Sequence, residues 1–321
     1  MSPPSLVSRT VHGLAWACGL SAHRARRMEC LRIVMLHGVG GAHLSTVAFV
    51  RQLRYVKRNF EVLPLADLLE RLRVPGRVTG REVALTFDDG LANHVAVAQP
   101  ILVRFRLPAT FFVCPGLIDQ GRWLWNHEAR ARLAYLGDEA RLGLLDSLDL
   151  SPAEDLSGRP AFGADPDDPV TRMKALVLAR RRAAEAAIRE ATPSFRPTAA
   201  QRADHDVMTW DDVLGLDPRW ITVGAHTSTH PTLPTLDDDD LRVEVEESGN
   251  RLEERLGRSV TLFCYPNGDE DDRVRAVAAR RYEGAVTTRA GVVHPGDDPY
   301  RLARIGVADG PATLAWRFHV P

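Results

Sequence analysis

Residues 85–90, with the sequence LTFDDG, place two adjacent carboxylates directly after an apolar run. Residues 83–85 are typical of the end of a buried strand, so Asp88 and Asp89 are expected where that strand leaves the core. Two neighbouring like charges repel each other, and near a dry core neither ionises easily. Asp-Asp-Gly is also ordinary turn chemistry. The stretch therefore indicates either a solvated turn or a site at which a nearby group uses the charge.

The composition is that of an ordinary globular protein. The chain has 321 residues, of which 45% are hydrophobic and 26% charged. Its 41 Lys and Arg residues balance 42 Asp and Glu residues, and a net charge of -1 gives no electrostatic reason to expect nucleic acid as a partner. The four cysteines are widely spaced, which favours a reducing compartment.

The N-terminal residues 11–20 superficially resemble the apolar part of a signal peptide. His12 and Gly13 interrupt the apolar run, however, and no A-x-A cleavage site follows it. We expect instead an amphipathic helix that packs on the body of the protein or lies on a membrane surface. This interpretation predicts a cytoplasmic protein, either free or associated peripherally with the inner face of the membrane.

Short apolar strands alternate with helical patterns along most of the chain. The predicted strands cover residues 31–37, 82–87, 109–114, 220–226, 260–266 and 283–288. The clearest predicted helices cover residues 45–58, 66–73 and 241–256. Such alternation indicates a parallel α/β sheet or barrel, and in these folds catalytic groups collect where strands end.

One long segment departs from this pattern. From about residue 123 to 210 the strand patterns disappear and Arg/Ala/Glu-rich helical sequence replaces them. We expect a helical insertion there, with a Pro-, Gly- and Asp-rich loop at residues 151–169. The predicted organisation is an N-terminal helical extension over residues 1–30 and one α/β domain over residues 31–321 that carries the insertion.

A second polar cluster, GAHTSTHP at residues 224–231, ends another predicted strand. His226 and His230 are four residues apart, so their imidazoles can point the same way. Two histidines and one carboxylate suffice to hold Zn²⁺ or a similar divalent ion. An isolated H-x-x-x-H is often coincidental, but together with two aspartates at another strand end it predicts a metal site. In this interpretation Asp89 binds the metal and Asp88 takes a proton from the attacking water.

Three stretches resemble the first three signature motifs of the polysaccharide deacetylases: TFDDG at residues 86–90, HTSTH at residues 226–230 and FCYPNG at residues 263–268. These are the NodB-homology or carbohydrate esterase family 4 enzymes, and the motifs stand in the family's order. The resemblance extends from about residue 31 to 307. It implies an irregular (β/α) barrel with Asp88 as general base and with Asp89, His226 and His230 as metal ligands.

The resemblance also implies an activity. A member of this family is a metal-dependent hydrolase that removes an N-acetyl group from an amino sugar, here in a glycan, a lipid-linked sugar or a nucleotide-sugar. Zinc is the first expectation for the metal, with cobalt, nickel, iron or manganese as alternatives. Two other functions stay open: a related deformylase or other amide hydrolase, and a catalytically inactive carbohydrate-binding protein. The complete set of base and ligands argues against the inactive protein.

The third motif departs from the family's usual pattern, which has an arginine where this chain has Cys264. In this respect the chain resembles the branch of the poly-N-acetylglucosamine deacetylases, whose motif order is rearranged. In that branch the acid histidine follows an early strand, and His37 occupies the matching place, with His294 as the next candidate. Arg304 on a late strand is the candidate to replace the missing arginine, and Arg301 competes with it. A histidine that merely closes a strand and an arginine in a surface salt bridge are the structural alternatives.

The resemblance further implies that the backbone N–H of Asn267 faces the developing oxyanion. Aromatic residues near strand ends are candidates for stacking on a sugar ring: Tyr265, Trp123, Trp125 and Trp210. For each of them, packing in the core is the alternative.

Overall fold

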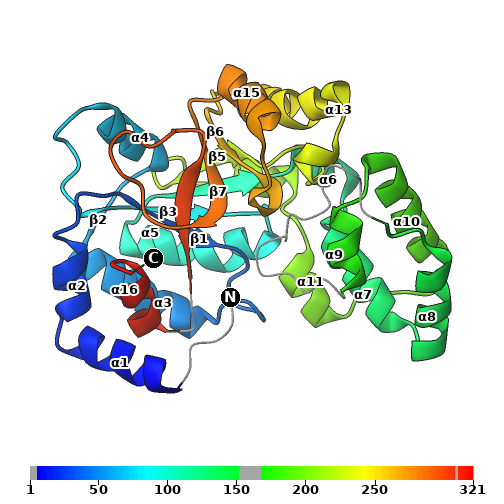
Figure 1. The fold of residues 1–321 in the computed structure, drawn as a ribbon, viewed down its shortest axis with the longest axis horizontal. Helices are drawn as coiled ribbons and strands as arrows, with labels where there is room; N and C mark the ends of the chain where they lie inside the picture. Colours follow the sequence, from blue (N-terminus) through cyan, green and yellow to red (C-terminus); the bar gives the residue numbers. More distant parts are fainter. Residues whose placement is uncertain (1–5, 152–167, 308–309, 321) are drawn as a thin grey trace.

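The computed structural model of the chain describes residues 6–151, 168–307 and 310–320, with side chains from residue 10 onward. Its strands are β1 (Arg32–Leu36), β2 (Glu61–Val62), β3 (Glu82–Phe87), β4 (Ala109–Val113), β5 (Ile221–Ala225), β6 (Leu262–Cys264), β7 (Gly284–Ala290) and β8 (Leu302–Gly306). All pairings among them are parallel, in the order β1-β8-β7-β6-β5-β4-β3-β2, and β1 also pairs with β3 along its whole length. Seven strands therefore close a barrel, and β2 pairs with the start of β3 outside the closed ring (Figure 1). The predicted irregular (β/α) barrel is confirmed.

The buried strands have the sequence that a parallel barrel requires. Every residue of β3 and β4 is buried, because one face of the strand points into the barrel and the other is covered by helices. The strand predicted at residues 260–266 is shorter than expected, since Pro266 begins the short 3₁₀ turn η5 (Pro266–Gly268). Strand β2 was not predicted, because two residues are too few to show a periodicity.

Helices connect the strands and cover the barrel. They are α3 (Thr46–Asn59), α4 (Leu65–Arg73), α5 (Gln99–Phe105), α6 (Pro115–Gln120), α12 (Trp210–Leu214), α13 (Asp238–Arg242), α14 (Ser248–Leu256), α15 (Asp272–Arg281) and α16 (Pro311–Arg317), with the short turns η1 (His94–Ala98), η3 (Leu233–Thr235) and η4 (Val243–Glu247). The helix predicted at residues 241–256 is continuous through the π-helical turn η4, and its apolar residues Leu241, Val245 and Leu252 are fully buried as their spacing indicates.

A separate helical lobe stands beside the barrel, at the right in Figure 1. It contains α7 (Trp125–Tyr135), α8 (Asp138–Ser147), α9 (Pro169–Lys174), α10 (Leu178–Glu190) and α11 (Ala199–His205). The lobe has an apolar core of its own, which includes Trp125, Leu133, Val170, Met173 and Ile188. The loop predicted at residues 151–169 lies, apart from its ends, outside the described residues.

The N-terminal helices α1 (Leu6–Ala17) and α2 (Leu20–Ala25) pack against α16. The ring of His12 stacks on Trp316 with centroids 4.6 Å apart. Arg32, the first residue of β1, is completely buried and donates hydrogen bonds to the carbonyls of Ala25 and Phe318, which joins both ends of the chain to the barrel. In the part of the chain that the structure describes, no helix combines the length and apolar character needed to cross a bilayer.

Candidate metal centre and active site

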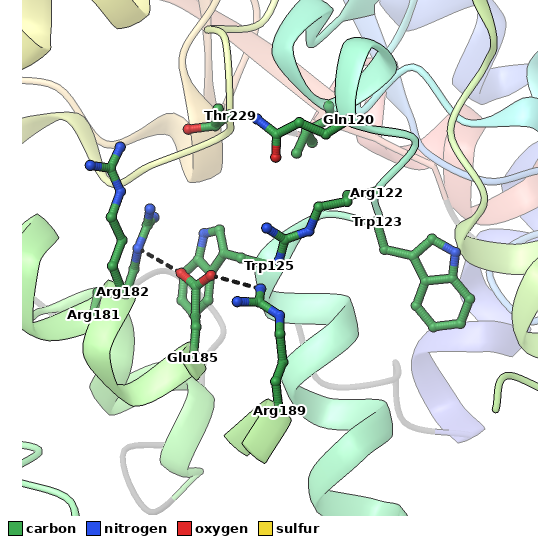
Figure 2. Close-up of a pocket in the computed structure, with 10 residues that line it drawn as sticks. Gln120, Arg122, Trp123, Trp125, Arg181, Arg182, Glu185, Arg189 and Thr229 are labelled. Atoms are coloured by element: carbon green, nitrogen blue, oxygen red, sulfur yellow. Dashed lines mark hydrogen bonds and ion pairs between the residues drawn. The ribbon is translucent and has the colours of Figure 1, made fainter. Parts of the chain in front are cut away.

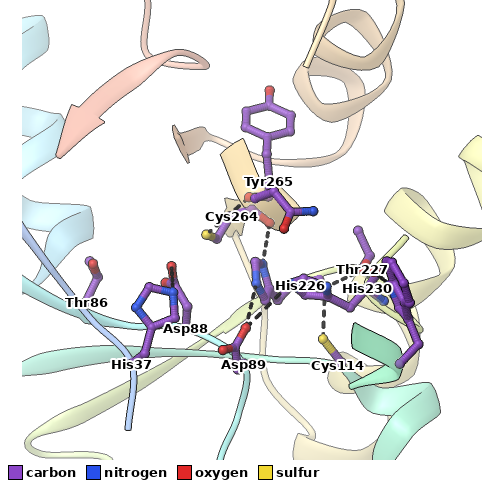
Figure 3. Close-up of polar contacts among 12 residues, drawn as sticks. His37, Thr86, Asp88, Asp89, Cys114, His226, Thr227, His230, Cys264 and Tyr265 are labelled. Atoms are coloured by element: carbon purple, nitrogen blue, oxygen red, sulfur yellow. Dashed lines mark hydrogen bonds and ion pairs between the residues drawn. The ribbon is translucent and has the colours of Figure 1, made fainter. Parts of the chain in front are cut away.

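The predicted site residues meet at the carboxyl-terminal ends of the barrel strands (Figure 3). His37 follows β1, the two aspartates follow β3, and His226 follows β5. In a parallel barrel all carboxyl ends lie at the same rim, so residues far apart in the sequence converge there. The backbone geometry alone therefore explains why these motifs form one site.

Asp88 and Arg304 form a buried ion pair at the centre of the site. Arg304 Nη1 lies 2.7 Å from Asp88 Oδ1, and Nη2 lies 2.7 Å from Oδ2. Asp88 is 2% exposed and Arg304 is completely buried. Burial raises the pKa of Asp88, but the charge and hydrogen bonds of Arg304 outweigh it and hold this pKa below its usual value. Asp88 is therefore an ionised carboxylate.

Three further contacts fix the guanidinium of Arg304. Its Nε donates to the carbonyl of Thr287, Nη1 to Thr86 Oγ1 at 3.0 Å, and Nη2 to Cys264 Sγ at 3.3 Å. Arg301, the competing candidate, instead forms ion pairs with Glu270 and Asp272 on the outside of the barrel. Of the two arginines, Arg304 is the one that the structure places against Asp88.

Asp89 faces the two histidines. Its Oδ1 lies 3.4 Å from His226 Nε2 and 3.5 Å from His230 Nε2, and one ligand atom from each residue lies within 4.8 Å of the others. Ligands about 2.0–2.2 Å from a tetrahedral ion lie about 3.3–3.6 Å apart, so this spacing fits a small divalent cation. The donor set of two imidazoles and one carboxylate also fits zinc and similar transition metals.

Two groups of this donor set, Asp89 and His230, have pKa values that suit a metal. Burial raises the pKa of Asp89, but the hydrogen bond to His226 and the surrounding imidazoles outweigh it and hold this pKa well below its usual value. Burial and the neighbouring His226 lower the pKa of His230 well below its usual value. An anionic carboxylate and a neutral imidazole are the forms that bind metal ions. Burial lowers the pKa of His226, but Cys264 and the hydrogen bond to Asp89 outweigh it and raise this pKa well above its usual value, so a metal ion would replace a proton on His226.

Contacts behind the ligands orient them. His226 Nδ1 donates to the carbonyl of Cys264 at 2.7 Å, which leaves Nε2 free to face Asp89. Buried Glu244 holds the loop between the histidines, because it accepts hydrogen bonds from the backbone N–H groups of Ser228 and Thr229, both at 2.8 Å. Glu244 therefore fixes the backbone of the loop that joins His226 to His230.

A second group of potential ligands, Asp88, His226 and Cys264, also lies within 4.8 Å. Burial raises the pKa of the Cys264 thiol despite the nearby Arg304, so this sulfur stays protonated. Asp88 has both oxygens bonded to Arg304. The group around Asp89 is accordingly the better candidate for a metal site.

Backbone strain concentrates at this site. Four residues of the predicted motifs have left-handed φ angles: Asp89 at 76°, Thr227 at 64°, His230 at 61° and Asn267 at 56°. A non-glycine residue in such a conformation costs about 1–3 kcal/mol, and strain of this kind is concentrated at functional sites. The left-handed turn at Asp89 separates the two adjacent carboxylates. Asp88 contacts Arg304, whereas Asp89 faces His226 and His230.

His37 lies beside the pair of Asp88 and Arg304. Its Nε2 is 3.9 Å from Asp88 Oδ2, and its side chain is 41% exposed and faces solvent. Buried His94, whose pKa is lowered to about 4 by burial, donates from Nε2 to the backbone carbonyl of His37. His294 lies near the start of β1, at the opposite end of the barrel, because Val293 bridges to Leu31.

The expectation that Tyr265 contacts a sugar is wrong. Its ring is completely buried against Phe263, its hydroxyl donates to the carbonyl of Tyr300, and its backbone N–H donates to Val286. Tyr265 follows β6 as expected, but its side chain points into the core. Trp210 also packs on the barrel, where its Nε1 donates to Asp119.

Asn267 contacts a residue that the sequence reasoning missed. Lys174, the last residue of α9, donates from Nζ to Asn267 Oδ1 at 2.5 Å, so the helical lobe reaches the third motif. Burial lowers the pKa of Lys174, although Asp269 and Asp89 attract its charge. Only the docking of the lobe brings Lys174 here, and no local sequence pattern indicates it.

Comparison with known proteins agrees with this geometry. Residues 76–139 and 182–282 match the family model described as polysaccharide deacetylase. A stretch of 58 residues, 18% of the chain, is 38% identical to chitin deacetylase 1 of Cryptococcus neoformans var. grubii and spans 12% of that protein.

Solved structures share the fold. The Streptococcus pyogenes deacetylase PplD in complex with acetate is 19% identical, with a TM-score of 0.59 over 90% of this chain and 98% of that chain. IcaB from Ammonifex degensii is 18% identical, with a TM-score of 0.59 over 91% of this chain and 98% of that chain. The polysaccharide deacetylase BC0361 from Bacillus cereus is 16% identical, with a TM-score of 0.55 over 90% of this chain and 69% of that chain.

The donor set makes a prediction about metal content. His230→Ala should lower zinc affinity by about 10-fold or more, since it removes one of three protein ligands. Asp88→Asn should bind zinc nearly as tightly as the wild type, because Asp88 is bonded to Arg304. Competition with a chromophoric chelator measures both affinities. Equal loss of zinc in the two variants would contradict the division between ligand and base.

Proposed function

The chain belongs to the polysaccharide deacetylase family, and we propose that it is a metal-dependent N-deacetylase that hydrolyses the acetamido group of an amino sugar. One observation carries this proposal. An ionised carboxylate, Asp88, held by Arg304, lies beside a separate donor set centred on Asp89. A site that only binds carbohydrate has no use for a proton acceptor next to a metal site.

The proposed reaction divides the work between the two aspartates. A divalent ion held by Asp89, His226 and His230 would supply the Lewis acid that polarises the acetamide carbonyl and makes water more acidic. Asp88 accepts the proton of the attacking water, and Arg304 keeps this carboxylate ionised and correctly oriented. The backbone N–H of Asn267 is proposed to stabilise the developing oxyanion.

His37 is the proposed general acid. An amide nitrogen leaves poorly unless it is protonated, so a donor is needed on the side of the leaving amine. The exposed imidazole of His37, with Nε2 3.9 Å from Asp88, lies at the open edge of the site where a sugar can reach it. The products are acetate and a free amine.

The proposed substrate is an N-acetylated sugar in a glycan, a lipid-linked sugar or a nucleotide-sugar. Zinc is the metal that the histidine and carboxylate donors favour first, with cobalt, nickel, iron and manganese as alternatives. A deformylase would use the same residues, and the acid that is released distinguishes it.

Acetate release tests the proposal directly. Zinc-loaded protein should release acetate from N-acetylglucosamine oligomers or from N-acetylglucosamine 1-phosphate, and Asp88→Asn should be slower by at least about 10²-fold. Because this variant leaves Arg304 buried without its anion, its fold and zinc content are checked by circular dichroism and metal analysis. Release of formate instead of acetate would favour the deformylase, and full activity of Asp88→Asn would reject the mechanism.

Arg304 should set the acid limb of the pH–rate profile. Arg304 lowers the pKa of Asp88, and only the ionised form accepts a proton. Arg304→Lys cannot form the two parallel hydrogen bonds, so the pKa of Asp88 should rise and the acid limb of kcat/KM should move to higher pH, by about one unit or more. Arg301→Lys is the matched control and should leave the profile unchanged. An acid limb that does not move in Arg304→Lys would show that another group limits the rate.

His37→Ala should slow turnover by about 10²–10⁴-fold, the usual contribution of a general acid. Zinc affinity should not change, because His37 is outside the donor set. His294→Ala, at the other end of the barrel, is the control and should retain full activity. Unchanged turnover in His37→Ala would leave this histidine as a residue that merely ends a strand.

A further inference from the structure

A cavity of about 380 Å³ lies between the barrel and the helical lobe (Figure 2). It is lined by Leu117, Gln120, Arg122, Trp123, Trp125, Arg181, Arg182, Glu185, Arg189 and Thr229. Two lining residues place it next to the proposed metal site: Thr229 directly precedes His230 in the chain, and Trp125 Nε1 donates to the carbonyl of His230 at 2.9 Å. The cavity and the proposed metal centre therefore share one wall, and the mechanism above does not use the cavity.

Positive charge dominates the lining. Four arginines face the cavity, with Glu185 as the single acidic lining residue. Arg181 and Arg189 both pair with Glu185 at 3.1 Å. Figure 2 shows Arg122 across the cavity from Arg181 and Arg182, with Glu185 between them.

The carboxylates around the cavity do not balance this charge. Glu128 accepts hydrogen bonds from Arg122, Arg132 and Arg189. Glu244, whose charge also acts on Arg181, accepts hydrogen bonds from the loop before His230. Even if Glu128, Glu185 and Glu244 are all ionised, their three negative charges face five positive charges, those of the four lining arginines and of Arg132 behind them, and about two positive charges remain.

Two of the arginines have donors to spare. The side chain of Arg181 is 5% exposed and lies over the Trp125 ring at 4.8 Å, yet its Nη1 has no hydrogen-bond partner among the described residues. Arg182 is exposed and forms no ion pair within the described part of the chain. A buried guanidinium with unused donors is costly unless an anion completes its shell.

We propose that this cavity binds a phosphate or diphosphate group. Its volume is in the range of small-molecule sites, which is about 300–1,000 Å³. Guanidinium groups that converge from different directions suit the tetrahedral oxygens of phosphate, and a charge of about minus two matches the excess. A carboxylate, planar and singly charged, fits less well. The phosphate belongs either to the sugar substrate, an assignment that rests on the proposed function, or to a separate ligand.

Binding of inorganic pyrophosphate to the zinc-loaded full chain, measured by calorimetry, tests the proposal. The wild type should bind with saturable heat, and Arg182→Gln and Arg122→Gln should each weaken binding by about 10-fold to 100-fold, as expected for a charged hydrogen bond. Arg182 is exposed, so its replacement should not disturb folding. Arg180→Gln is the matched control, because Arg180 lies on the same helix and pairs with Asp149 instead of lining the cavity. No binding, or equal binding by the wild type and Arg182→Gln, would overturn the proposal.

Kinetics then identify the source of the phosphate. If the substrate carries it, Arg182→Gln should raise KM for N-acetylglucosamine 1-phosphate by about 10-fold and leave a neutral N-acetylglucosamine oligomer unaffected. If a separate ligand carries it, pyrophosphate should change turnover of the neutral oligomer without competing with it. Both results support the proposal that the cavity binds a phosphate group. Pyrophosphate binding that depends on Arg182, in a protein that releases no acetate, would reject the proposed function and leave the phosphate site standing.

Discussion

The bidentate pair of Asp88 and Arg304 is the contact on which the rest of the site depends. Burying both charges costs several kcal/mol each, and this cost is offset only because both oxygens of the carboxylate are bonded. The same guanidinium also contacts Thr86 on β3, Thr287 on β7 and Cys264 on β6. One side chain on β8 therefore ties four strands of the barrel together and keeps the proposed base ionised. The interaction that keeps the proposed base ionised therefore also cross-links strands of the barrel.

The neighbouring aspartate depends on a different constraint, the left-handed backbone at Asp89. In an extended strand, successive side chains already point to opposite faces, but the turn at Asp89 is needed to bring its carboxylate to His226 and His230. The histidine loop is strained as well, at Thr227 and His230. Strain at both ends of the donor set indicates that the surrounding structure holds the ligands in place before any ion binds.

Much of this arrangement was predictable from the sequence because its determinants are local. Strand ends carry the site residues, and parallel strands bring their ends together. What could not be predicted depends on packing: Arg301 and Arg304 are three residues apart, and only the barrel interior decides which one is buried. Tyr265 follows a strand end like a site residue, but its ring turns into the core. Lys174 and the arginine-lined cavity depend on how the helical lobe docks, which no local periodicity specifies.

The loop between His226 and His230 joins these parts of the molecule. On one side its histidines form the donor set, and on the other Thr229 lines the arginine cavity. Glu244 fixes the loop from the barrel, and Trp125 fixes it from the helical lobe through the carbonyl of His230. Because both contacts lie within two residues, the loop cannot shift toward the cavity without moving a proposed metal ligand. The docking of the lobe is therefore part of the geometry of the proposed metal site, even though the family's motifs lie on the barrel.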